Sequence, residues 1–263
     1  MFRPFYIAAT GMDAFQTDLE SIIDNVSNSQ TTGYKKGSVE FANIFPQVLE
    51  KAVKEYSEGR SAAPGLEIGS GVKIVGTPRD FSQGSMNVTN NPMDVAIKGE
   101  GFLQFALADG TTAYSRAGSL SRDSEGMIVN GSGNALEPQI SLPEETTGVI
   151  INQDGRVYVQ INDSVDQQEI GQITLAAFIN PAGLESIGDN LYVQTVASGE
   201  PRVDVPGSSG MGALEQFALE GSNVDIVSEM MRMIITQRSF DVISKAVQGG
   251  EGMLKSALEI AQG

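Results

Sequence analysis

The sequence contains no histidine and no cysteine. Without histidine there can be no Ser-His-Asp triad, no imidazole general base and no imidazole ligand for a metal ion. Without cysteine there can be no thiol nucleophile, no thiolate zinc site and no disulfide, an absence that suits the cytosol and the periplasm equally. An enzyme made from this chain would have to use paired carboxylates, a Ser-Lys arrangement or a hard cation on oxygen ligands.

Positive charge is also scarce. Lys and Arg number 17 against 33 Asp and Glu, which gives a net charge of −16 and an isoelectric point near 4.3. Nucleic acid is therefore excluded as a partner, because binding to phosphates requires a basic surface that releases counterions. Anionic membrane surfaces are disfavoured for the same reason.

Long apolar runs are missing too, and no stretch approaches the roughly 20 residues that a membrane span needs. The first residues, MFRPFYIAATGMDAFQTDLE, lack a basic segment followed by an unbroken apolar stretch. We therefore expect no membrane insertion and no cleaved signal peptide.

What the chain does contain is helical apolar spacing near its N-terminus. A helix is predicted from about Pro4, a residue favoured at the first helical position, to about residue 28, where the polar cluster 28–33 ends it. Its apolar residues recur at alternating intervals of three and four, which is the pattern of a helix that packs against a partner. They are Phe5, Ala8, Met12, Phe15, Leu19, Ile22 and Val26.

A second helical pattern occupies the C-terminal segment from Ser222, which is expected to cap the first turn, towards residue 261. Its apolar positions are Val224, Val227, Met231 and Ile234, followed by Ile243, Ala246, Gly250, Met253, Ala257 and Ile260. Internal glycines at 249, 250 and 252 each cost about 0.5–1 kcal/mol relative to alanine, so this helix should require a packing partner. The glycines would allow that partner's backbone to approach closely.

Between these helices, from about residue 66 to 215, the pattern becomes that of short strands. Asp109-Gly110 and Asp154-Gly155 lie between strand-like runs and predict hairpins. The glycines at 99–101 and 131–133 and the acidic segment 123–126 are interpreted as turns, because none completes a phosphate loop or a calcium loop. The sequence therefore predicts no catalytic residue, no metal site and no cofactor.

The predicted fold class is α+β, with N- and C-terminal coiled-coil-forming helices flanking a mainly antiparallel β domain. Residues 1–33 and 222–263 would form a terminal helical domain, residues 34–75 a connector and residues 76–221 the β domain. The polar, glycine-bearing stretch 56–65 within the connector is interpreted as a long linker. Spacing alone leaves open whether the two terminal helices pair within one chain or with other chains.

Several segments, in this order along the chain, resemble those of the bacterial flagellar rod and hook protein family. DNVSNSQTTGYKK at 24–36 is similar to the family's N-terminal signature, whose usual form is close to NNLANxxTxGFK. Further matching segments are 65–72, 91–102, 114–120, 184–192 and 219–225 through 246. Within the family, the chain length and the GLEIGSGV segment after a long connector resemble the distal rod members, and the proximal rod members are the alternative.

The resemblance implies a structural subunit rather than an enzyme. Its terminal segments would be disordered in the monomer and would assemble into an inner tube of coiled-coil helices, with the β domain outside and the 46–65 connector stiffening the rod. It would be exported by the flagellar type III route without a cleaved signal peptide and would transmit torque across the periplasm. Its partners would be further copies of itself, other rod proteins, the hook protein and the surrounding ring proteins.

The predicted assembly interface therefore consists of the apolar positions of the two helices. Its residues are Phe5, Met12, Phe15, Leu19, Ile22, Val26, Val224, Val227, Met231, Ile234, Ile243, Met253 and Ile260. Two competing classes are an enzyme that acts on cell-wall glycan through carboxylates and a monomeric adhesin-like β module with a helical stalk.

Overall fold

The computed structural model describes residues 3–50, 66–161, 167–208 and 210–262. The described residues divide into two compact units, each built from separate stretches of sequence. The first unit comprises the described parts of 1–26, 37–78 and 226–263, and the second comprises those of 27–36 and 79–225. The linker predicted at 56–65 lies outside the described residues.

The first unit contains the two terminal helices, α1 (Arg3–Ser27) and α2 (Ile226–Gln262). The N-terminal helix therefore matches the predicted limits closely. The C-terminal helix begins four residues later than predicted, and Ser222 does not cap it. Its glycines at 249, 250 and 252 lie inside an unbroken helix.

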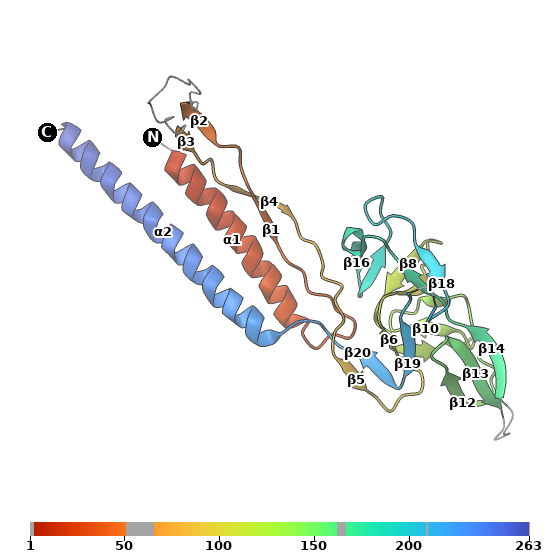
Figure 1. The fold of residues 1–263 in the computed structure, drawn as a ribbon. Coiled ribbons are helices and arrows are strands. Elements are labelled where there is room, and N and C mark those ends of the chain that lie inside the picture. Colours follow the sequence, from red (N-terminus) through yellow and green to blue (C-terminus); the bar gives the residue numbers. More distant parts are fainter. Residues whose placement is uncertain (1–2, 51–65, 162–166, 209, 263) are drawn as a thin grey trace, which may run out of the picture. The chain divides into compact units, whose positions relative to one another are not determined.

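Two antiparallel strand pairs complete the first unit (Figure 1). The strands β1 (Glu40–Asn43) and β4 (Val72–Gly76) pair with each other, as do β2 (Gln47–Glu50) and β3 (Leu66–Ile68). Arg3 at the start of α1 donates hydrogen bonds to Gln47 Oε1 at 2.6 Å and to the carbonyl of Ile68 at 3.2 Å. These contacts attach the first turn of α1 to the β2–β3 pair.

The second unit is a β structure in which every described strand pair is antiparallel. Its largest sheet has seven strands in the order β16-β17-β8-β7-β11-β10-β9. Those strands are β7 (Leu103–Ala106), β8 (Thr112–Ser115), β9 (Leu120–Arg122), β10 (Ile128–Asn130), β11 (Ala135–Glu137), β16 (Glu185–Gly188) and β17 (Leu191–Val193).

Smaller sheets in the second unit join strands that lie far apart in the sequence. A three-stranded sheet contains β12 (Thr146–Ile151), β13 (Arg156–Ile161) and β14 (Gln167–Gln172). The two-stranded pairs are β5 (Met86–Val88) with β20 (Ala218–Glu220), β6 (Val95–Lys98) with β19 (Ala213–Gln216), and β15 (Leu175–Ala177) with β18 (Arg202–Asp204). A short 3₁₀ helix, η1, spans Pro181–Gly183.

Both predicted Asp-Gly hairpins are confirmed. Gly110 and Gly155 have φ values of 84° and 83°, the left-handed conformation that glycine adopts without steric cost. They close the β7–β8 and β12–β13 hairpins through turn hydrogen bonds of 3.0 Å to Leu107 and Asn152. The segment 123–126, which was interpreted as a turn, likewise joins β9 to β10.

The core of the second unit has an aliphatic part and an aromatic part. Phe102, Tyr114, Phe178 and Tyr192 are buried, and the rings contact one another or Phe81 edge-on at centroid distances of 4.8–5.8 Å. Edge-on packing is the favoured arrangement for aromatic pairs. The aromatic part also packs against a buried charge, because Arg116 Cζ lies 5.8 Å from the centroid of the Phe102 ring.

Candidate functional site

The two terminal helices contact each other along a regular seam. Asn25 Nδ2 donates to Glu229 Oε2 at 3.5 Å, and the Thr236 hydroxyl donates to Asp18 Oδ2 at 2.9 Å. A Cβ placed on Gly11 would lie 3.2 Å from Ile243 Cδ1. Each step of seven residues back along α1 thus matches a step of seven residues forward along α2. The helices are therefore antiparallel and pair within one chain (Figure 1).

An ion pair also joins the two helices along this seam. Arg232 Nη2 lies 3.0 Å from Asp18 Oδ1, and Arg232 Nη1 lies 3.5 Å from Glu229 Oε2. Asp18, Asn25, Glu229 and Thr236 are buried. These four side chains were not predicted as site residues. Their signal in the sequence is the seven-residue spacing between 18 and 25 and between 229 and 236.

On α1, most predicted interface residues lie beside the row of fully buried residues and not in it. The buried residues are Gly11, Ala14, Asp18, Ile22 and Asn25. Ile22 is shared with the prediction. The other predicted positions on this helix are half-buried, namely Phe5, Met12, Phe15, Leu19 and Val26.

On α2, most predicted interface residues are exposed within the single chain. The exposed fractions are 65% for Val227, 55% for Met231, 52% for Ile234, 74% for Met253 and 82% for Ile260. Ile243 is half-buried against α1, and Val224 precedes the helix and belongs to the second unit.

Further exposed apolar residues lie among the predicted ones on the N-terminal half of α2. They are Ile226, Met230, Ile235 and Val242, with exposed fractions of 41–66%. We call Ile226, Val227, Met230, Met231, Ile234, Ile235 and Val242 the α2 apolar face. Contiguous exposed apolar surface of this kind marks interaction sites in soluble proteins.

A cavity of about 320 Å³ lies between the two helices. It is lined by Phe15, Gln16, Leu19, Thr236, Gln237, Phe240 and Asp241. The predicted residues Phe15 and Leu19 are therefore brought together, and they face α2 residues that the apolar pattern did not single out.

The second unit contains a buried ionic cluster that was not predicted from the sequence. Lys35 Nζ lies 2.7 Å from Glu220 Oε1 and donates to the carbonyl of Ser82 at 2.6 Å. Arg116 Nε lies 3.2 Å from Glu220 Oε2, and Arg116 Nη1 donates to the carbonyls of Gly99 and Gly101, each at 2.8 Å. The side chains of Lys35 and Glu220 are fully buried and that of Arg116 is 4% exposed.

Burial sets the protonation behaviour of this cluster. Desolvation lowers the pKa of Lys35, although its hydrogen bond to Glu220 opposes the shift. Desolvation likewise lowers the pKa of Arg116, and the charge of Glu220 opposes it. Glu220 is thus the counter-charge that keeps two buried cations in place.

The cluster brings together segments that are far apart in the sequence. Lys35 belongs to the 24–36 segment, Arg116 to 114–120 and Glu220 to 219–225. The backbone follows the same arrangement, because Gly33 N donates to the carbonyl of Glu220 at 2.8 Å. The Asn223 side chain accepts from Lys36 N and donates to the carbonyl of Asp80, each at 2.8 Å. The chain segments next to both helices are thereby fixed within the second unit.

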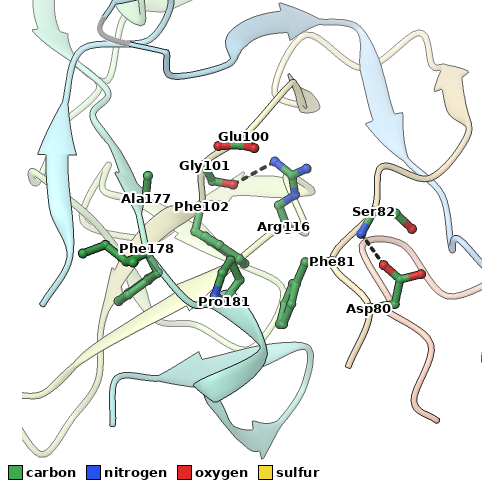
Figure 2. Close-up of a pocket in the computed structure, with 11 residues that line it drawn as sticks. Asp80, Phe81, Ser82, Glu100, Gly101, Phe102, Arg116, Ala177, Phe178 and Pro181 are labelled. Carbon is green, nitrogen blue, oxygen red and sulfur yellow. Dashed lines mark hydrogen bonds between the residues drawn. The ribbon is translucent and has the colours of Figure 1, made fainter. Parts of the chain in front are cut away.

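A pocket of about 440 Å³ lies beside the cluster (Figure 2). Phe81, Phe102 and Phe178 contribute aromatic surface to it, and Arg116 and Glu100 contribute charged groups. Arg116 is already engaged by two carbonyls and Glu220, so its role here is structural.

No group of three or more acidic side chains is placed to hold a metal ion in the described part of the chain. Among the helices described, none has the length and apolar character needed to cross a membrane.

Two family models match this chain, one within the β unit and one at the C-terminal segment. Residues 96–159 match the family model of the flagellar hook protein FlgE/F/G D1 domain. Residues 215–260 match that of the flagellar basal body rod FlgEFG protein C-terminal region. The second match includes Glu220 and most of α2.

Curated relatives match over almost the whole chain. The flagellar basal-body rod protein FlgG of Borreliella burgdorferi is 43% identical over 97% of this chain and 97% of its own length. The FlgG proteins of Caulobacter vibrioides and Bacillus subtilis are 38% and 33% identical, over 96% and 99% of this chain and 97% and 99% of their own lengths. On these matches, the chain belongs to the flagellar basal-body rod protein family, whose members are structural proteins and not enzymes.

Proposed function

We propose that this chain is a structural subunit of the distal rod of the bacterial flagellum, which assembles with copies of itself into a helical tube and transmits torque to the hook. The relatives described above carry the name FlgG, which favours the distal rod over the proximal rod. The observation that carries the proposal is the exposed α2 apolar face.

The terminal helices are the proposed assembly domain. α1 packs on the side of α2 that carries Glu229, Thr236 and Ile243, so the α2 apolar face remains open to another copy. Fully burying an aliphatic side chain contributes about 1.5–3 kcal/mol, so several half-exposed residues could together stabilise a coiled-coil contact between copies. A contact that joins this face to a different surface of the next copy repeats from copy to copy, and it generates a helical array when its rotation does not close into a ring.

The buried cluster suits the transmission of torque. Lys35, Arg116 and Glu220 fix the chain segments adjacent to both helices within the β unit. A force on the helices would therefore reach the β unit through two chain connections, and this cluster holds residues of both.

The remaining parts of the proposal follow from the family. Residues 1–33 and 222–263 would form the inner tube, 34–75 a connector that stiffens the rod, and 76–221 the outer β domain. Other rod proteins, the hook protein and the surrounding ring proteins would be the partners, and export would use the flagellar type III route without a cleaved signal peptide.

Sedimentation velocity of the purified full chain over a range of concentrations tests the proposal. The parent should form large assemblies as concentration rises, and Ile234→Lys should shift assembly to at least tenfold higher concentration, since about 1.4 kcal/mol lost per contact is a factor of ten. Ile179→Lys is the matched control, because Ile179 is 96% exposed in the second unit. Equal effects of the two substitutions, or a parent that stays monomeric throughout, would contradict the proposal.

A further inference from the structure

The seam between α1 and α2 differs from an ordinary helix–helix core in its chemistry. At two successive positions it pairs Asn25 with Glu229 and Asp18 with Thr236, and all four side chains are buried. Two further positions pair a large side chain with a glycine. Ile243 contacts Gly11, and a Cβ placed on Gly250 would lie 3.4 Å from Phe5 Cζ.

Buried polar pairs of this kind contribute little net stability, because desolvation offsets most of the attraction. Their best-attested use in paired helices is to specify one register among several. Asp18 has the contacts that such a role requires, because its two carboxylate oxygens accept from Thr236 and Arg232 on the facing helix at 2.9 and 3.0 Å.

Sliding one helix past the other by seven residues shows what these contacts select against. In one direction Asp18 would lie opposite Ile243, and a buried carboxylate would lose Thr236 as its donor. In the other direction Asp18 would lie opposite Glu229, and two carboxylates would face each other. Sliding in the first direction would also place Gly11 opposite Gly250 and leave a void. Each alternative register is therefore penalised by a different pair.

We propose that Asp18, Arg232 and Thr236 form a register lock, which sets a single antiparallel alignment of α1 on α2. The lock also decides which side of α2 is occupied within the chain. It keeps the polar seam inside and leaves the α2 apolar face for a second copy, and this last consequence rests on the proposed function. The three residues act as specificity determinants and not as the main source of helix stability.

The absence of cysteine makes the lock directly testable, because two introduced cysteines are the only thiols in the chain. Ala9 and Lys245 are both exposed, and the pairing of 18 with 236 and of 11 with 243 places them at the same level along the helix axes. Spin labels at these two positions report the alignment by pulsed electron resonance. A slip of seven residues moves one label by about 10.5 Å along the helix axis. Diluting labelled chain into an excess of unlabelled chain restricts the signal to distances within one chain.

The test variant is Asp18→Leu with Thr236→Leu, which makes the layer apolar without removing the helices. The labelled parent should give one distance, and the variant should keep its helical circular dichroism and give at least one additional distance. Asp13→Leu with Gln248→Leu, two exposed positions, is the control and should leave the single distance unchanged.

Two results would overturn the lock. One is a test variant that keeps the parent's single distance, and the other is a parent that shows no defined distance between α1 and α2. Sedimentation of the same samples separates this proposal from the proposed function. If the lock fails in chains that assemble normally, the lock is refuted and the rod function stands. If the lock holds in chains that never assemble, the rod function is refuted and the lock stands.

Discussion

Replacing Glu220 by Gln should severely destabilise the β unit. The substitution keeps the size of the side chain but removes its charge from a site with 0% side-chain exposure. Lys35 and Arg116 then lose the carboxylate that contacts both of them, and the Gly84 N–H, which donates to Glu220 Oε1 at 2.9 Å, keeps only an uncharged amide oxygen as its acceptor. Breaking a buried ion pair from one side costs about 3–5 kcal/mol.

The assay is thermal and urea unfolding followed by near-ultraviolet circular dichroism of tyrosine, since Tyr34, Tyr114 and Tyr192 all belong to this unit and are buried. At about 2–4 °C per kcal/mol for a unit of this size, the midpoint should fall by roughly 6–20 °C. The double variant Lys35→Met/Glu220→Gln removes one of the stranded cations and should recover part of the loss, which a double-mutant cycle measures.

Glu169→Gln is the matched control, because Glu169 is 47% exposed and lies 3.9 Å from Arg156 Nη1. An exposed pair of this kind contributes about 0–1 kcal/mol. If Glu220→Gln costs no more than Glu169→Gln, the buried cluster does not hold the segments together as described.

Two further predictions concern the same unit. Burial raises the pKa of Tyr192 and Tyr114 above the ordinary value of 10.0. Above pH 10.0 the unfolded chain therefore releases these phenol protons while the folded chain still holds them. The free energy of unfolding should consequently fall as the pH rises beyond 10.0. In a pH titration followed by phenolate absorbance, some tyrosines of the folded chain should ionise at a higher pH than those of the unfolded chain. Tyr192→Phe should reduce this share of tyrosines and urea should abolish it, and equal ionisation in the folded and unfolded chain would refute the prediction. Gly33→Ala should cost about 1–3 kcal/mol in urea unfolding, because Gly33 has a φ of 69° and its Cβ would lie 2.6 Å from Ala117 N. Gly131→Ala, which meets nothing within 4 Å, should be nearly neutral, and similar losses at both glycines would contradict the argument.

Local patterns in the sequence were sufficient to predict α1, the presence of α2 and the two Asp-Gly hairpins. The three-and-four spacing and Pro4 predicted α1, and the Asp-Gly pairs predicted two hairpins, because these signals depend on neighbouring residues alone. The start of α2 was predicted too early for a physical reason. Asn223 bonds to Lys36 and Asp80, and these tertiary hydrogen bonds hold the segment before Ile226 out of the helix.

Long-range pairings could not be read from the sequence in the same way. Lys35 and Glu220 are 185 residues apart, and neither lies in a pattern that reveals its partner. The apolar pattern of α2 correctly located a helix but did not tell which side α1 would contact. Within the chain α1 contacts Glu229 and Thr236, whereas Met231 and Ile234 remain exposed.

Electron microscopy of the purified full chain at high concentration tests most directly whether the terminal helices assemble copies into a rod. We expect tubes or filaments with a regular helical repeat, which Ile234→Lys shortens or abolishes and Ile179→Lys leaves intact. A monodisperse particle at every concentration, with fully helical termini that resist protease, would contradict it.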